Sequence, residues 1–253
     1  MHPDWIRPDW PAPRTVRALQ TTRRGGCSEG PYDSLNLGDG VGDVPGAVEA
    51  NRARLRLGAG LPAAPVWLRQ VHGTTVVEAH ACRGGPPEAD AAWTDRPGIV
   101  CAVLTADCLP VLLCDRAGRR VAVAHAGWRG LAAGVLERVV AAMEVESAEL
   151  LAWLGPSIGA DAFEVGEEVT ERFLRLDAGA TAAFRPGRPG HWLADLPRLA
   201  RRRLHGLGVR DIRESGLCTF FGADRFFSHR RDGPHTGRMA TLIWLQPHNN
   251  AET

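Results

Sequence analysis

Three short apolar runs near the middle of the chain limit what it can fold into. Each has the length of a buried β-strand, and together they cover residues 99–105, 110–114 and 121–125. A helical pattern follows directly, because apolar residues recur every four positions at Leu131, Val135, Val139 and Met143. Strands and helices interleave in the same way further along the chain. The pattern therefore indicates a mixed α/β or α+β sheet protein.

The remaining elements are predicted from shorter patterns. Further strands are expected at residues 66–68, 75–78, 150–154, 225–229 and 239–245, and further helices at 165–176 and 195–205. Asp195 is expected to cap the second of these helices. The last two strands are typical of a hairpin, joined by the arginine- and glycine-rich turn 230–238. Two Gly/Pro-rich stretches, 84–87 and 185–190, are predicted to be surface loops.

The length and the absence of repeats favour one domain. A chain of 253 residues can bury a sizeable core, and no linker or composition shift divides it. We expect residues 1–20 to be an N-terminal leader, loosest over the Pro/Trp-rich residues 1–13, and residues 21–247 to form a single catalytic domain. The start of the chain lacks the apolar core of a signal peptide, and Asp107 interrupts the longest apolar stretch. Six cysteines without a CxxC pair then indicate reduced thiols and a cytoplasmic location.

The charged residues exclude several classes of function. The formal net charge is only +1, which argues against a generic nucleic-acid or membrane-surface binder. All 30 basic residues are arginine, because the sequence contains no lysine. This excludes a lysine Schiff base, a pyridoxal-phosphate enzyme and a Walker-type phosphate loop, each of which needs an amine. Any bound phosphate must be held by arginine, by backbone N–H groups or by a metal.

Reactive side chains fall where three predicted strands end. The segments concerned are 68–73, 104–110 and 123–130, which carry His72, Cys108 and His125. Imidazole and thiolate both suit zinc, and three protein ligands leave a fourth position for water or substrate. The intervals between these residues match no short zinc motif, and a lone histidine or cysteine at a strand end is more often a packing residue.

Asp107 and several arginines are further candidates. A carboxylate between two apolar runs is expected to be buried, so Asp107 serves either structural hydrogen bonding or acid/base chemistry. The pairs 23–24 and 230–231, together with Arg129 and Arg238, could bind phosphate through the planar guanidinium, although a single arginine among 30 is more often a solvated surface charge. Arg129 opens the predicted helix, where free backbone N–H groups also favour an anion.

Six segments and the C-terminal tail resemble one family from about residue 21 to residue 245. The segments are TTRRGG (21–26), YDSLNLG (32–38), QVHG (70–73), TADCLP (105–110), AHAGWRG (124–130) and LGPSIG (154–159), and the tail is FFSHRRD (226–232) with TGRMA (236–240). They resemble the YfiH/laccase-domain family, whose members have been described as laccase-like copper polyphenol oxidases, peptidoglycan-editing factors and zinc-dependent purine nucleoside phosphorylases. The tail departs from the usual pattern, because His229 stands where relatives commonly have tyrosine and His235 lies in an unusual context.

The resemblance implies a fold, a metal site and an activity. The fold is a single α/β domain of layered mixed sheets flanked by helices, and the metal ligands are His72, Cys108 and His125. The implied activity is phosphorolysis of adenosine, inosine and methylthioadenosine, together with adenosine deamination, at a zinc site. Nucleoside and inorganic phosphate are then the partners, with no nucleic acid or membrane, and the chain is expected to be a monomer or a weak homodimer.

Roles for single residues follow as hypotheses. Cys108, Asp107 and His125 are the expected catalytic residues, with Asp107 moving protons and zinc activating a water. Arg23, Asn36 and Arg129 are the expected substrate-binding residues.

Two alternative functions are also compatible with the sequence. In the first, the protein is a copper polyphenol oxidase, although no His-x-His pair is present for a multicopper centre. In the second, it is a metal-free cysteine hydrolase or amidase acting on peptidoglycan precursors, with Cys108 as nucleophile and His125 or His72 as base. A non-catalytic binding module explains the cysteine and histidines least well.

Overall fold

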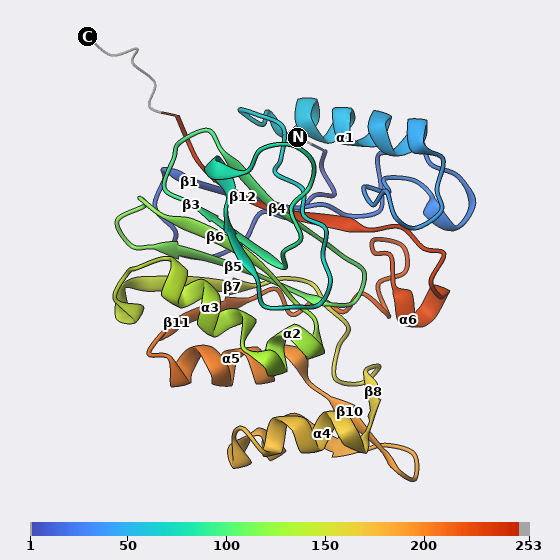
Figure 1. Cartoon of the computed structure of the whole chain (residues 1–253). Coiled ribbons are helices and arrows are strands. Elements are labelled where there is room, and N and C mark those ends of the chain that lie inside the picture. The colour runs from blue at the N-terminus through green and yellow to red at the C-terminus, as the bar shows by residue number, and fades with distance from the viewer. Residues whose placement is uncertain (1, 248–253) are drawn as a thin grey trace.

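The computed structural model describes residues 2–247 and consists of stacked layers (Figure 1). A three-stranded antiparallel sheet has the order β1 (Val16–Gln20), β12 (Met239–Leu245), β4 (Val100–Thr105). A six-stranded mixed sheet has the order β11 (Asp211–Glu214), β7 (Leu150–Leu154), β5 (Leu109–Asp115), β6 (Val121–Ala126), β3 (Ala91–Thr94), β2 (Val76–Glu78). A small sheet adds β8 (Glu164–Gly166), β10 (His191–Ala194) and β9 (Phe184–Pro186).

The described residues contain six α-helices, most of which lie on the outer faces of the two larger sheets. They are α1 (Pro45–Ala59), α2 (Trp128–Ala133), α3 (Val135–Ala142), α4 (Glu167–Leu174), α5 (Leu196–Gly206) and α6 (His229–Asp232). Short 3₁₀ helices lie at Gly30–Tyr32, Ala79–Ala81, Ser147–Glu149 and Ala178–Ala183. Figure 1 shows α1 over the three-stranded sheet, with α2, α3 and α5 below the six-stranded sheet and α4 with the small sheet beyond them. None of the helices in residues 2–247 is long and apolar enough to cross a membrane.

The core follows these layers. One apolar cluster lies between α1 and the three-stranded sheet, a second lies between the two larger sheets, and a third lies between the six-stranded sheet and its helices. β5 is buried at every position because both of its faces are covered. The mixed α/β architecture of layered sheets predicted from the sequence is confirmed, including the three apolar strands.

The helix predicted from the four-residue spacing is divided in two. Gly134 lies between α2 and α3 with a φ of 101°, a left-handed conformation that glycine adopts readily. The apolar spacing continues across the break, because α2 and α3 both pack on the six-stranded sheet. The helix predicted at 165–176 also starts later than expected, because residues 164–166 form β8.

The hairpin predicted at the C-terminus is wrong. Phe226 and Phe227 are buried in a small cluster rather than in a strand, and Ser228 caps α6 by accepting a hydrogen bond from the Arg231 N–H. β12 pairs instead with β1 and β4. Residues 66–68 likewise form no strand, and only Val66 makes an isolated bridge, to Cys101. The proposed loop 185–190 begins inside β9.

The segment expected to be a leader, residues 1–20, includes a strand. Its last five residues, Val16–Gln20, form β1, an edge strand of the three-stranded sheet. Ile6 makes a bridge to Gln20, and Trp5 is buried in the cluster beneath α1. Buried apolar side chains therefore attach this segment to the domain, whereas its many prolines predict a loose segment.

Candidate metal centre

Three side chains that are far apart in the sequence meet where the two larger sheets join. The ligand atoms of His72, Cys108 and His125 all lie within 4.8 Å of one another. The Cys108 Sγ is 3.7 Å from the His72 Nε2, and the two imidazole rings meet edge to face with centroids 4.7 Å apart. His125 is buried and His72 is exposed, so the cluster opens to solvent on the His72 side.

A crossing between the two sheets positions Cys108. β4 ends at Thr105 in the three-stranded sheet, and β5 begins at Leu109 in the six-stranded sheet. Within this short connection Asp107 has a φ of 91°, which few residues other than glycine adopt. The sharp turn leaves Cys108 partly exposed although the strands on both sides of it are almost wholly buried.

The strand β6 and a buried carboxylate orient His125. Alternation along β6 places His125 on the side of Val121 and Val123, toward the core between the larger sheets. Its Nδ1 lies 2.8 Å from the Asp90 Oδ1. Because an ionised carboxylate only accepts hydrogen bonds, Nδ1 carries a proton, and Nε2 is the nitrogen that a metal would bind in place of the second proton.

The same carboxylate holds the loop that carries His72. Asp90 accepts backbone hydrogen bonds from Val71 at 3.2 Å, His72 at 2.9 Å and Gly73 at 2.6 Å. His72 has a φ of 60°, a conformation that these bonds stabilise. Sequence reasoning missed Asp90. A carboxylate among the apolar residues Ala89, Ala91 and Ala92 is the signal that could have found it, because a buried charge needs partners.

Charge coupling inside the cluster favours a thiolate beside a protonated imidazole. Burial alone would raise the pKa of Cys108, but the imidazoles of His125 and His72 outweigh it and lower the pKa to about 6. Burial likewise opposes the charge on His125, yet Cys108 and Asp90 raise its pKa to about 9. For Asp90, burial is outweighed by the hydrogen bonds from His125, Gly73 and Val71, which lower its pKa. A thiolate is the form of cysteine that binds metals.

Gly127 leaves room at the centre of the cluster. A Cβ at this position would lie 2.9 Å from His72 Cδ2, 3.0 Å from Cys108 Sγ and 3.6 Å from His125 Nε2. Two imidazoles, one thiolate and this side-chain-free space fit a metal ion with three protein ligands and one open position. Within residues 2–247, this is the one group of three or more His, Cys, Asp or Glu side chains that could hold a metal.

Comparison with known proteins places the chain in a family. The sequence profile of the family described as multi-copper polyphenol oxidoreductase laccase matches residues 17–246. The chain belongs to this laccase-domain family. A purine nucleoside phosphorylase of Pseudomonas aeruginosa is 56% identical over 243 residues, which cover 96% of this chain and 98% of that protein. The purine nucleoside phosphorylase YfiH of Escherichia coli is 53% identical over 240 residues, with 95% and 98% covered.

Solved structures of laccase-domain relatives share the fold. A protein of Neisseria meningitidis from the family DUF152 superposes with a TM-score of 0.93 at 52% identity, covering 96% of this chain and 100% of that chain. YlmD from Geobacillus stearothermophilus superposes with a TM-score of 0.90 at 31% identity, covering 96% of each chain. The YfiH/laccase-domain resemblance inferred from the sequence motifs is therefore confirmed.

In this laccase-domain chain, Asp107 lies beside the candidate metal ligand Cys108, but structural contacts occupy its carboxylate. Its Oδ1 accepts a hydrogen bond from the Thr219 hydroxyl at 2.6 Å. Its Oδ2 accepts from the Ser228 hydroxyl at 3.0 Å and from the Arg230 backbone N–H at 2.7 Å. Both oxygens are thus engaged, and they join the Cys108 turn to the start of α6.

The predicted substrate-binding residues Arg23 and Arg129 share no contact partner. Arg23 donates from Nε to the Asp33 carbonyl and from Nη1 to the Ala223 carbonyl, and its guanidinium lies 4.6 Å from the Phe227 ring centroid. Arg129 is exposed in the first turn of α2 and lies over the ring of Trp128. Because α2 has only six residues, it offers a poorly developed helix dipole for an anion.

Asn36 is a structural amide in this laccase-domain chain. It is fully buried, and its Nδ2 donates to the Gly38 carbonyl and to Asp43. Its Oδ1 accepts from the backbone N–H groups of Gly38 and Arg238. Every side-chain donor and acceptor direction thus has a protein partner, so Asn36 shapes the loop around it.

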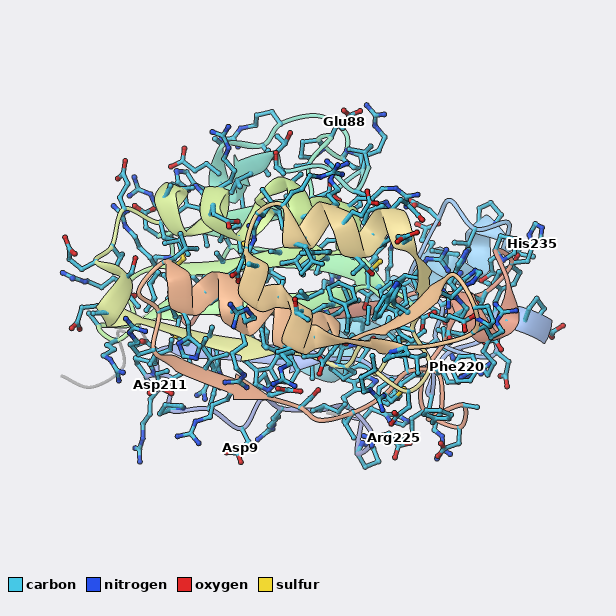
Figure 2. The ribbon with its side chains drawn as sticks, turned by 90° about the horizontal axis from the view of Figure 1, so that it is seen from below. Asp9, Glu88, Asp211, Phe220, Arg225 and His235 are labelled. Carbon is cyan, nitrogen blue, oxygen red and sulfur yellow. The ribbon has the colours of Figure 1, made fainter. Side chains whose placement is uncertain are left out.

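The two unusual histidines of the tail are exposed. His229 is the first residue of α6. His235 lies at one end of the molecule, near the pale blue N-terminal part of the ribbon (Figure 2). A Cβ at Gly42 would lie 3.0 Å from the Tyr32 hydroxyl and 3.7 Å from His235 Nδ1, so the 30–43 loop and the tail meet there.

Proposed function

We propose that this protein is a zinc-dependent purine nucleoside phosphorylase. Its substrates would be adenosine, inosine or methylthioadenosine with inorganic phosphate, and its products the free base and a ribose 1-phosphate. The same centre would also deaminate adenosine. The observation that carries the proposal is the open cluster of His72, Cys108 and His125, backed by Asp90. The printed names of the relatives that match nearly the whole chain support the choice of reaction.

The donor set supports zinc as the metal. Two imidazoles and one thiolate form a common catalytic zinc set, which keeps one position open. A zinc ion held there would supply Lewis acidity, lowering the pKa of a bound water or polarising a substrate oxygen. The chain itself contributes the fixed ring of His125, the ordered loop of His72 and the empty space at Gly127, which keeps this position accessible.

Asp107 enters the proposal as a positioning residue. General acid or base action would need one of its oxygens to face substrate, and three donors already occupy both oxygens. By joining the Cys108 turn to Thr219 and Ser228, it fixes the thiolate relative to the two histidines. The acid/base role expected from the sequence stays a prediction, which a substitution at this position tests.

The geometry also favours one rival, a cysteine hydrolase. Cys108, His125 and Asp90 stand in the order of nucleophile, base and orienting carboxylate. In that reading Cys108 would attack an amide, as an amidase for peptidoglycan precursors requires. A covalent adduct of Cys108 in metal-stripped, fully active protein would favour this function over zinc-dependent phosphorolysis.

The copper alternative has less support from the described residues. The family description names a multi-copper oxidoreductase, whereas residues 2–247 contain one candidate cluster with a single cysteine and two histidines. Stoichiometric copper together with a strong thiolate-to-copper absorption band would reverse this ranking.

The deciding experiment measures metal and product together. Purified protein is analysed for zinc and assayed for free base released from adenosine with and without phosphate. We expect about one zinc per chain and phosphate-dependent release, and we expect Cys108→Ala to lose both. Cys82→Ala is the matched control, because Cys82 is only partly exposed yet lies outside the cluster. Full zinc content and full turnover in Cys108→Ala would overturn the proposal.

A further inference from the structure

Arg238 lies at the edge of the candidate metal centre. It directly precedes β12, whose first residue Met239 pairs with Thr105 at the end of β4. Cys108 follows Thr105 after a short turn, so the register of the three-stranded sheet brings Arg238 to the same end as Cys108. The charges are close enough to interact: burial lowers the pKa of Arg238, and the negative charges of Cys108 and Asp107 act in the opposite direction.

The Arg238 side chain is held in a defined orientation. Its backbone N–H donates to the Asn36 Oδ1 at 2.9 Å. Its Nη1 donates to the carbonyls of Thr236 at 2.7 Å and Gly237 at 3.0 Å. The chain passes so close at Gly38 that a Cβ there would lie 2.8 Å from the Arg238 Cγ. These contacts restrain the guanidinium before any ligand arrives, which reduces the entropic cost of binding.

One edge of this guanidinium remains available. Nε and Nη2 of Arg238 have no hydrogen-bond partner among residues 2–247, and neither atom is sealed from solvent. These two nitrogens point in parallel, which matches the spacing of two oxygens on a phosphate. An anion bound there would also compensate the charge of a half-buried arginine.

Two neighbouring arginines, Arg231 and Arg23, are committed to other contacts. Arg231 uses Nε, Nη1 and Nη2 on Asp232 and on the backbone carbonyls of Thr219, Phe220 and Phe226. Arg23 uses Nε and Nη1 on carbonyl groups and stacks on Phe227. Arg238 is therefore better placed than either to offer a two-pronged donor beside Cys108.

We propose that Arg238 binds phosphate through Nε and Nη2 and holds it beside the metal centre as the attacking group. This role rests on the phosphorolysis proposed above. A phosphate oxygen forms a bond to the ribose C1′ while the bond from C1′ to the purine nitrogen breaks. The bonding electrons leave with the purine, and the proton lost by hydrogen phosphate ends on that nitrogen. No oxidant or further reactant is needed.

The test separates phosphate binding from turnover. Inorganic phosphate is titrated calorimetrically into zinc-loaded wild type and Arg238→Gln, and initial rates are measured with adenosine at varied phosphate. Loss of a charge-assisted pair predicts phosphate affinity weaker by about tenfold or more and a KM for phosphate raised to match. Zinc content and the KM for adenosine should change by less than about threefold. Arg238→Lys keeps the charge without the two-pronged geometry, so it should bind phosphate with intermediate affinity and keeps the test decisive if Arg238→Gln folds poorly.

A control variant separates the loss of Arg238 from the loss of any other arginine. Arg198→Gln removes an exposed arginine on α5 and should behave as wild type. Wild-type phosphate affinity in Arg238→Gln would overturn the assignment. If Arg23→Gln or Arg129→Gln lost phosphate binding while Arg238→Gln kept it, the anion would bind at that other arginine. A wild-type protein that binds no phosphate would overturn the assignment too. If phosphate binding depends on Arg238 but no free base is released from any nucleoside, the anion site stands and the proposed function fails.

Discussion

Asp90 and Asp107 are two buried carboxylates that border the same centre, yet their surroundings differ in kind. Asp90 is fully buried and accepts from three backbone N–H groups and the His125 ring. Asp107 is 8% exposed and accepts from two hydroxyls and one backbone N–H. An N–H group can only donate, whereas a hydroxyl can turn and accept. The Asp90 region therefore demands a carboxylate, and the Asp107 region can accept an amide.

The largest expected effect comes from Asp90→Asn. Whichever way the new amide is oriented, its NH₂ group faces N–H donors, or it forces the His125 proton onto the metal-binding nitrogen. We expect zinc affinity to fall by about 10–100-fold, the usual cost of losing a carboxylate behind a metal-bound histidine. Competition with a chromophoric chelator measures it. Zinc affinity within about twofold of wild type would show that the loop and ring do not depend on Asp90.

Gly127→Ala tests the space at the centre of the cluster without replacing any of the three candidate ligands. The backbone at Gly127 has φ −62° and ψ 156°, which alanine adopts without strain. The added methyl carbon would lie 2.9 Å from His72 Cδ2 and 3.0 Å from Cys108 Sγ, closer than van der Waals contact. Both side chains would have to shift, so we expect zinc affinity to drop by about tenfold. Gly46→Ala, where a Cβ meets nothing within 4 Å, is the control. Unchanged zinc affinity in Gly127→Ala would mean that the ligands can shift to make room.

Asp107→Asn should be much milder. The amide can donate to the Thr219 hydroxyl and keep its oxygen toward Ser228 and Arg230, and asparagine tolerates a positive φ. We expect unchanged zinc affinity, a loss of about 1 kcal/mol or less in unfolding free energy and a kcat within about tenfold of wild type. A fall in kcat of about 100-fold or more at full zinc content would instead establish Asp107 as the acid or base.

The smallest expected effect is that of Thr219→Val. It removes one fully buried hydroxyl and leaves the other two donors on Asp107 in place. We expect about 1 kcal/mol of lost stability in urea unfolding, with zinc affinity and kcat unchanged. Loss of zinc in this variant would show that the surroundings of Asp107 and Asp90 are coupled, which would contradict the distinction drawn between them.

The sequence predicts the parts of this fold that depend on local patterns. Short apolar runs located β4, β5 and β6, and the strand ends drew attention to the three metal-ligand candidates. The resemblance to a family joined them into one set. Asp90 was missed because its partners lie 17 to 35 residues away, and no local pattern reports them.

The arginines show why the rest could not be predicted. Arg23 in a Gly-rich segment has the signature of an anion site, but its Nη1 donates to the carbonyl of Ala223, 200 residues away. Whether a guanidinium is free for a ligand depends on such distant carbonyls. The strand predicted at 225–229 fails for a related reason, because two buried phenylalanines satisfy a strand pattern and a loop cluster equally well.

β12 lies between β1 and β4, so neither of these two strands has its partner in the three-stranded sheet until residues 239–245 are in place. Cys108 lies in the connection from β4 of that sheet to β5 of the six-stranded sheet, which also contains His125. During synthesis, β1 and β4 leave the ribosome well before β12, the strand that pairs with both of them. The turn that carries Cys108 therefore has a complete sheet on its β4 side only after a strand that begins 131 residues later, at Met239, has been made.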